Sequence, residues 1–329
     1  MIKRREFIAG LGSAAAWPVV ARAQQADRVR RVGVLRLEPV YDEFTQTSIA
    51  ALREGLEALG WKEGRNLQLD IRFAGGDPNA VGPYADELVN LAPGVIVVSA
   101  NMVTTSVQRR TRTISIVFIG GGDPVAGGLV KSLAHPEGNT TGITNLFPSM
   151  GGKWLELLRG VAPRVARVAL LFNPELLRTT TFLADAEAAA AASSVKAIRT
   201  PYRNATELER AVEVFAAEPN GAAMVLPPGI FGTNRDLLFR LAVRHRLPAI
   251  YQSRAYADAG GLMSYGSNGV ELYRQSASYV DRILRGAKPG ELAVQFPAKF
   301  EWVVNLKTAK DMALDIPPTL RSRADEVIE

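Results

Sequence analysis

Short apolar runs alternate with amphipathic stretches along most of the chain. The apolar segments 32–35 and 95–98 have the length of buried strands, and 67–73 places an apolar residue at every second position. Between them, apolar residues at helical spacing predict a helix over 49–59, and Gly60 suits its end. Strands that alternate with helices in units of about 30 residues predict right-handed βαβ crossovers and a parallel sheet.

The same order of segments occurs twice. Three pairs of segments match in register: 31–35 with 167–171, 95–98 with 222–225, and 126–129 with 259–262. The sequence therefore predicts an α/β fold of two similar doubly wound parallel-sheet lobes, joined by a multi-strand hinge. We expect an N-terminal lobe of residues 27–143 plus 266–292, and a C-terminal lobe of residues 144–265 plus 293–329.

Two finer expectations concern local structure. Asp123 followed by Pro124 is a favourable helix start, which predicts a helix over 125–133. The Pro317-Pro318 pair is expected to end the ordered structure, with a polar tail from there to Glu329.

The first 23 residues have the pattern of an export leader. Lys3-Arg4-Arg5 precedes an apolar stretch over 9–20, and Ala21-Arg22-Ala23 has the A-x-A form of a cleavage site. Paired arginines followed by x-Phe-Ile resemble a twin-arginine signal. The apolar stretch is shorter than the roughly 20 residues that a membrane span needs. A buried N-terminal helix is the alternative, but we expect cleavage near Ala23 and a periplasmic mature protein.

Composition excludes several classes of function. The formal net charge is +6, of which the leader carries +3, and the remaining excess is spread without a block that would indicate nucleic-acid binding. The chain has no cysteine and only two histidines, His135 and His245, so disulfides, thiolate sites and a Ser-His-Asp triad are not expected. No G-x-S-x-G elbow and no metal-site spacing occurs, which argues against an enzyme. We therefore expect no catalytic residues, no cofactor and no metal.

Polar residues follow the predicted strands of the first lobe. Solutes bind beyond the carboxyl ends of parallel strands, so Ser99 and Asn101 are candidate contacts, as are Gly122 and Asp123 after the next strand. The glycines of 120–122 could expose backbone N–H groups to an anion, or could simply form a flexible turn. Asp123 could pair with a ligand ammonium or cap the following helix.

The second lobe offers a comparable set of residues. Asn173 follows the first predicted strand of this lobe, and Pro228 and Tyr251 follow its third and fourth strands. Tyr251 or Tyr202 could stack on an aromatic solute, and each could equally be an aromatic residue at the edge of the core. Arg254 could hold a carboxylate, or could be an ordinary solvated arginine.

A series of motifs in order along nearly the whole chain resembles the ABC-transporter substrate-binding family, whose members include tryptophan and tyrosine receptors. The motifs are Lys3–Ile8, Asp123–Val130, Pro136–Gly142, Gly151–Leu158, Gly260–Gly266, Tyr279–Pro289, Asn305–Lys310 and Ile316–Pro318. The resemblance implies a type I periplasmic-binding-protein fold whose two lobes close on a small solute. It also implies that Asn145 faces that solute. Asn268 stands where relatives carry aspartate, which removes a negative charge that would hold an ammonium group.

The expected function is the periplasmic solute-binding component of an ABC importer. Its partners would be a small solute, with an aromatic amino acid favoured, and an inner-membrane permease, with no nucleic acid and no insertion into the membrane. An exported sensory receptor that signals to a membrane kinase or chemoreceptor is the alternative. The sugar-responsive repressors have a similar fold, but only about eight residues separate the cleavage site from the first strand, too few for a helix-turn-helix domain.

Overall fold

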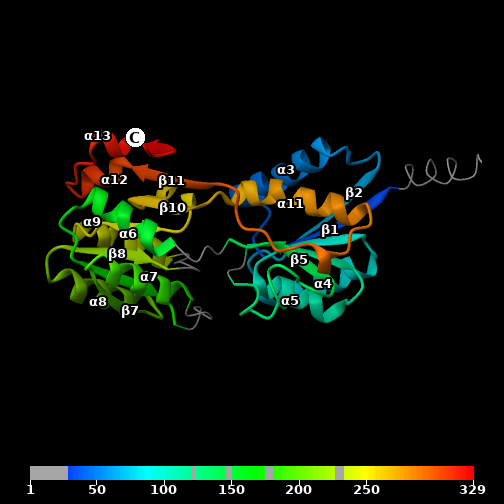
Figure 1. The fold of residues 1–329 in the computed structure, drawn as a ribbon, viewed down its shortest axis with the longest axis horizontal. Helices are drawn as coiled ribbons and strands as arrows, with labels where there is room; N and C mark the ends of the chain where they lie inside the picture. The colour runs from blue at the N-terminus through cyan, green and yellow to red at the C-terminus, as the bar shows by residue number, and fades with distance from the viewer. Residues whose placement is uncertain (1–28, 121–122, 146–149, 175–180, 227–232) are drawn as a thin grey trace, which may run out of the picture. The chain divides into compact units, whose positions relative to one another are not determined.

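The computed structural model describes residues 29–120, 123–145, 150–174, 181–226 and 233–329. The chain forms two compact units (Figure 1). The first contains the chain up to Phe118 with His135–Gly142 and Tyr273–Ala293, and the second contains Ile119–Ala134, Ile143–Leu272 and Val294–Glu329. The leader lies outside the described residues, and the lobe boundaries expected from the sequence stay a prediction.

The first sheet has five strands in the order β2-β1-β3-β4-β5. β1 pairs in parallel with both β2 and β3. The strands are β1 (Arg30–Arg36), β2 (Leu67–Phe73), β3 (Val95–Ser99), β4 (Ser115–Ile119) and β5 (Thr140–Ile143). The helices of this part are α3 (Glu43–Ala58), α4 (Val81–Asn90) and α5 (Asn101–Arg110), with the short 3-10 helix η1 (Pro78–Ala80).

Local chemistry sets the limits of the first long helix. Asp42 accepts a hydrogen bond from the backbone N–H of Thr45, at 2.8 Å, and so caps the start of α3. Gly60, with a φ of 92°, ends the helix as its sequence position predicts. Gly55 packs α3 against α11 (Gly269–Leu284), because a β-carbon there would lie 2.8 Å from that of Ala277.

The second sheet has seven strands in the order β12-β11-β10-β9-β8-β6-β7. Its strands are β6 (Arg167–Phe172), β7 (Lys196–Pro201), β8 (Gly221–Val225), β9 (Ala249–Tyr251), β10 (Met263–Ser267), β11 (Phe300–Asn305) and β12 (Glu326–Ile328). The helices are α6 (Met150–Val161), α7 (Thr181–Ala192), α8 (Ala205–Ala216), α9 (Thr233–Arg244), α10 (Arg254–Asp258), α12 (Leu306–Asp311) and α13 (Pro318–Arg321), with η2 (Pro289–Glu291) in the first unit. β10 and β11 are antiparallel, and the other described pairs are parallel.

The internal repeat is confirmed by the strand order. The order β2-β1-β3-β4-β5 of the first sheet recurs as β7-β6-β8-β9-β10 in the second. The register also repeats: Val32 lies opposite Val95 in the first sheet, and their sequence counterparts Val168 and Ala222 lie opposite each other in the second. The fold class expected from the sequence, two similar α/β lobes with parallel sheets, is confirmed.

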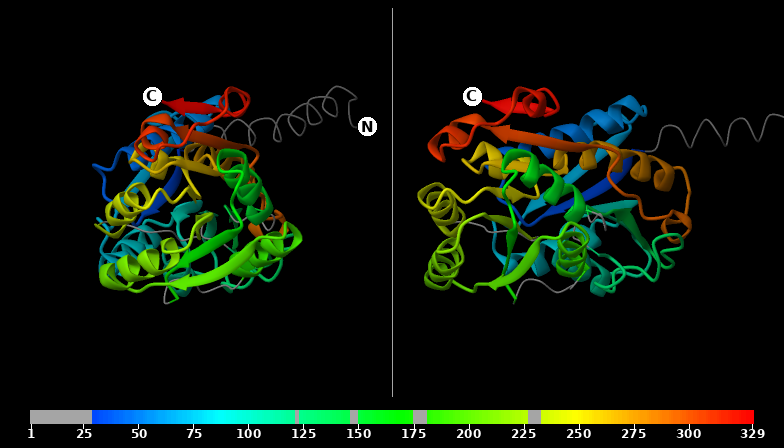
Figure 2. Two further views of the ribbon diagram at one scale, coloured as in Figure 1. Left: turned by 90° about the vertical axis from the view of Figure 1, so that its left-hand side faces the viewer. Right: turned by 60° about the vertical axis from the view of Figure 1, so that its left-hand side comes forward.

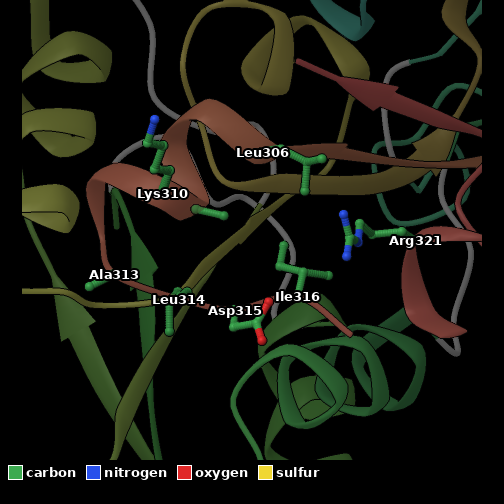
Figure 3. Close-up of a pocket in the computed structure, with 8 residues that line it drawn as sticks. Leu306, Lys310, Ala313, Leu314, Asp315, Ile316 and Arg321 are labelled. Atoms are coloured by element: carbon green, nitrogen blue, oxygen red, sulfur yellow. The ribbon is translucent and has the colours of Figure 1, made fainter. Parts of the chain in front are cut away.

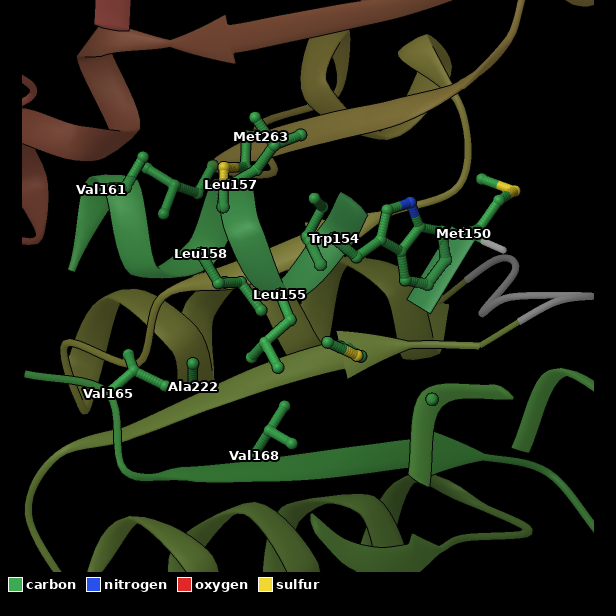
Figure 4. Packing of buried hydrophobic residues seen from close by; sticks show 14 of the residues in the cluster. Met150, Trp154, Leu155, Leu157, Leu158, Val161, Val165, Val168, Ala222 and Met263 are labelled. Carbon is green, nitrogen blue, oxygen red and sulfur yellow. The ribbon is translucent and has the colours of Figure 1, made fainter. Parts of the chain in front are cut away.

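Helices cover both faces of the second sheet, which explains why its strands are apolar throughout. Val168 and Leu170 pack against α6 and α7, whereas Ala169 and Leu171 pack against α8 and α9. Figure 4 shows the first of these layers, with Trp154 and the leucines of α6 over β6 and β8. The indole N–H of Trp154 donates to the backbone oxygen of Tyr265, so this large side chain is buried with its polar atom satisfied.

Two local expectations were wrong. Residues 124–128 form turns, and no helix covers 125–133. The C-terminal segment is ordered, because α13 starts at Pro318 and β12 adds a parallel strand to β11, as Figure 2 shows in red beside orange. A proline at the first position of a helix needs no N–H partner, so the Pro317-Pro318 pair starts an element here.

Candidate functional site

The carboxyl end of β3 is the first place where the sequence predicted solute contacts. Ser99 is the last residue of β3 and Asn101 the first of α5. Between them, Ala100 has φ 62° and ψ 150°, a conformation that costs a non-glycine residue about 1–3 kcal/mol. The side-chain Oδ1 of Asn101 is buried and has no hydrogen-bond partner among the described residues. Backbone strain beside an unsatisfied amide oxygen is typical of a binding site.

A buried arginine lies at the carboxyl end of the neighbouring strand β1. The side chain of Arg36 is 1% exposed, and its Nε donates to Glu38 Oε2 at 2.9 Å. Its Nη2 donates to the hydroxyl of Thr45 at 3.3 Å, while Nη1 has no partner in the described part of the chain. The hydroxyl of Ser99 donates to the same Glu38 Oε2 at 3.2 Å. We call Arg36, Glu38, Thr45, Ser99 and Tyr273 the Arg36 cluster.

Two aromatic rings complete the surroundings of the guanidinium group. The central carbon of Arg36 lies 4.6 Å from the ring centroid of Tyr273 in α11, and 5.7 Å from that of Phe44. Both distances lie within the range of cation–π attraction. Burial raises the pKa of the Tyr273 phenol to about 12, although the charge of Arg36 opposes this shift. The positive charge is thus held by a carboxylate, a hydroxyl and two π faces.

The raised pKa of Tyr273 predicts an alkaline change in stability. Above its usual pKa near 10 the unfolded phenol loses its proton, whereas the folded one keeps it to about pH 12. The free energy of unfolding therefore falls with rising pH in this window, by about 1.4 kcal/mol per pH unit for this group. Tyr273→Phe, which keeps the ring over Arg36, should show a shallower decline in urea unfolding series at pH 10 to 12.

A matched control for this experiment is Tyr41→Phe. The Tyr41 side chain is 80% exposed, and its replacement should leave the alkaline slope unchanged. Equal slopes for the wild type and Tyr273→Phe would show that this phenol does not govern the decline.

The Arg36 cluster was not expected from the sequence. Arg36 lies between Leu35 and Leu37 at the end of an apolar run. A cation flanked by leucines at the end of a strand was the only local sign that its side chain is buried. Glu38 follows two residues later, with Pro39 after it. The pattern alone could not show that the arginine is buried, because its burial depends on Tyr273, more than 200 residues away.

In the second unit, Asp123 uses one carboxylate oxygen to cap a turn. Its Oδ1 accepts from the backbone N–H groups of Val125 and Ala126, at 2.9 and 3.0 Å. The capping role considered from the sequence is therefore present, although it caps turns and not a helix.

Two further asparagines of the second unit follow strands: Asn145 comes after β5 of the first sheet, and Asn173 after β6 of the second. Asn145 is exposed and lies beside Gly120, where a β-carbon would stand 3.5 Å from its amide nitrogen. Asn173 follows β6 and is partly exposed. Their role as solute contacts stays a prediction. Gly122 and Pro228, the two other candidates, lie outside the described residues.

Tyr251 and Tyr202 are core residues. The side chain of Tyr251 is 1% exposed, its ring stacks on Tyr256 at a centroid distance of 5.3 Å, and Phe239 meets it edge-on at 5.4 Å. Tyr202 is 3% exposed in the same apolar cluster. Burial raises the pKa of both phenols well above the usual value. Tyr251 and Tyr202 are therefore core aromatic residues, which was the second of the two roles considered for them, because other side chains already cover them.

Asn268 caps a helix. Its Oδ1 accepts from the backbone N–H of Glu271 at 3.0 Å at the start of α11, and its Nδ2 donates to Glu301 at 2.7 Å. Both ends of the amide are therefore occupied. Arg254, likewise, is engaged in ion pairs with Glu326 and Asp258 on the surface, which is the solvated alternative considered for it.

One hollow of the second unit lies away from these strand ends. It has a volume of about 370 Å³ and is lined by residues of α12 and the segment after it (Figure 3): Leu306, Ala309, Lys310, Ala313, Leu314, Asp315, Ile316 and Arg321. Because β11 runs antiparallel to β10, α12 starts at the amino edge of the parallel strands. A second hollow, of about 290 Å³, lies at the start of β2, again at an amino edge. Neither has the position expected for the solute.

The described residues contain no group of three or more histidine, aspartate or glutamate side chains placed to hold a metal ion. No helix among them combines the length and apolar character that crossing a membrane requires.

Comparison with known proteins identifies the family. A family model described as ABC transporter substrate binding protein matches residues 38–328. The chain belongs to this family. The binding protein is 22% identical over 289 residues to a tyrosine-binding protein of Clostridioides difficile (strain R20291). The aligned region covers 87% of this chain and 81% of that relative.

Solved structures give the same fold. A conserved domain protein from Vibrio cholerae matches with a TM-score of 0.79 and 26% identity, over 91% of this chain and 100% of that one. A Streptococcus pneumonia ABC domain, solved in complex with L-Trp, matches with a TM-score of 0.79 and 21% identity. This match also covers 91% of this chain and 100% of that one. The binding protein therefore has the type I periplasmic-binding-protein fold that its motifs implied, and the family resemblance is confirmed.

Proposed function

We propose that this protein is the solute-binding component of an ABC importer, that it closes its two lobes on a small amino-acid-like solute, and that it delivers this solute to an inner-membrane permease. Membership of the family over residues 38–328 carries the proposal. An aromatic amino acid is the favoured solute, since one relative is named a tyrosine-binding protein and another was solved with L-Trp. The N-terminal pattern supports export to the periplasm with cleavage near Ala23.

We propose the strand-end residues as the contacts for that solute. In the first unit these are Ser99 and Asn101, whose buried Oδ1 lacks a partner among the described residues and so suits an N–H donor. In the second unit they are Asp123, Asn145 and Asn173. Asp123 retains an oxygen beyond the one that caps its turn.

The proposal is tested by ligand-induced thermal stabilisation of the purified mature protein. A solute present at 100 times its dissociation constant adds about 2.7 kcal/mol to the stability of the folded state. For lobes of this size that corresponds to a rise in Tm of about 5–10 °C. We expect such a rise with an aromatic amino acid, in a panel that also holds aliphatic amino acids, peptides, purines and organic acids. No rise with any member of the panel would refute a solute-binding role of this kind.

A further inference from the structure

The side chain of Glu38 is partly exposed, and its carboxylate is held in place at the carboxyl end of β1. Its side chain is 38% exposed, and its Oε2 accepts from both Arg36 and Ser99. No described residue forms a hydrogen bond with Oε1. Glu38 therefore presents one oxygen outside the Arg36 cluster, while the other fixes the orientation of the group.

Arg36 is built to position this carboxylate. The guanidinium is buried, and it is held by Glu38, by Thr45 and by the rings of Tyr273 and Phe44. Because its own contacts restrict its movement, the arginine orders Glu38 before any ligand arrives. A group ordered in advance loses less conformational entropy on binding, so its contact with a ligand contributes more to affinity.

The segment after Glu38 carries exposed apolar side chains. Val40 is 52% exposed, Tyr41 is 80% exposed and Phe44 is 40% exposed. A fixed carboxylate followed closely by aromatic and aliphatic side chains matches an organic ammonium with an apolar body. The carboxylate accepts hydrogen bonds from the ammonium, and aromatic faces attract the positive charge.

We infer that Glu38, positioned by Arg36 and Ser99, is the acceptor for a primary ammonium group, and that the solute is an amine-bearing molecule. This inference rests on the proposed solute-binding function and assigns the residue that recognises the amine of the solute.

The competing explanation is that Glu38 serves only as the counter-ion of the buried Arg36. A counter-ion affects every ligand alike through the stability of the lobe. An ammonium acceptor affects only ligands that carry the amine. The two roles are therefore separated by ligands that differ in this one group.

The test uses the full mature chain and isothermal titration calorimetry with three probes: L-tyrosine, tyramine, and 3-(4-hydroxyphenyl)propionate, which lacks the amine. The variants are Glu38→Gln, Glu38→Asp and the double variant Arg36→Met/Glu38→Gln, which removes both charges and so leaves no unpaired buried cation. Glu63→Gln is the matched control, since Glu63 is an exposed acid of the same unit that pairs with Arg53.

We expect the wild type to bind L-tyrosine, and Glu38→Gln and the double variant to bind it about 10- to 100-fold more weakly. Affinity for the propionate should change less than threefold, Glu38→Asp should retain part of the preference for the amine, and Glu63→Gln should match the wild type. Equal affinity of Glu38→Gln and wild type for L-tyrosine would overturn the inference, as would equal losses for all probes. Wild-type protein that binds the propionate as well as L-tyrosine refutes the amine requirement alone. Wild type that binds none of the three refutes the aromatic solute itself, and the inference with it.

Discussion

Gly266→Ala is expected to unfold the second unit or to destabilise it by about 4 kcal/mol or more. Gly266 lies in β10 opposite Glu301 of β11, and a β-carbon added there would lie 1.7 Å from the backbone oxygen of Gln252. Real β-carbons do not approach an oxygen so closely, and the obstacle is main chain that follows β9. Relief would require β9 and β10 to separate, with loss of their parallel pairing.

Chemical denaturation followed by circular dichroism measures this effect. We expect the transition of the second unit to move to much lower denaturant, or the variant to be recovered only as insoluble protein. Gly152→Ala is the matched control, because Gly152 is an exposed residue of α6 with no atom within 4 Å of its added β-carbon. A helix gains about 0.5–1 kcal/mol from this change, so the control should be as stable as the wild type or slightly more. An unchanged midpoint for Gly266→Ala would show that the two strands can separate at little cost.

Glu38→Gln is expected to destabilise the first unit by about 3 kcal/mol. The substitution leaves the charge of Arg36 buried without a counter-ion. The estimate lies at the lower end of the range for broken buried pairs because Glu38 is 38% exposed and is therefore partly screened by water. Arg36→Met should cost less, since it removes the buried charge and leaves a carboxylate that water can reach.

The distinguishing result is the double variant Arg36→Met/Glu38→Gln. It should be more stable than Glu38→Gln alone, although it carries one more substitution, because an apolar side chain replaces an unpaired cation. Urea unfolding of the four proteins gives the double-mutant cycle. Glu63→Gln, which breaks the exposed pair with Arg53, should change stability by less than about 1 kcal/mol. A double variant less stable than Glu38→Gln would contradict this account of the pair.

Glycines in two of the sequence motifs are required for the reason given for Gly266: an added β-carbon would clash with nearby atoms. Gly142 ends the motif Pro136–Gly142, and a β-carbon there would lie 2.1 Å from the backbone oxygen of Phe118. Gly261 and Gly266 stand in the motif Gly260–Gly266, where added β-carbons would meet Tyr251 and Gln252. These positions require glycine because strands and turns pass each other at main-chain distance. The motifs therefore reflect close packing inside each lobe as well as the family to which the chain belongs.

Solute contacts were harder to predict than strands for a specific reason. A residue just after a strand can face solvent, the core or a helix end, and the local pattern is the same in each case. Tyr251 joins the core because Tyr256 and Phe239 cover its ring. Asn268 becomes a cap because α11 begins directly after it and Glu301 takes its amide.

The sequence by itself determined several strands, the first long helix, the internal repeat and the family, because apolar periodicity and turn residues are local and the repeat shows the same pattern twice. Only the tertiary structure decided that Arg36 is buried, that Glu38 is held at an exposed strand end, and that the C-terminal residues form a strand. Each of these depends on partners far along the chain: Tyr273 for Arg36, Ser99 for Glu38, and β11 for β12. A charged side chain is buried only where the fold supplies its counter-charge and hydrogen bonds, and those partners are set by how the strands are ordered and not by neighbouring residues.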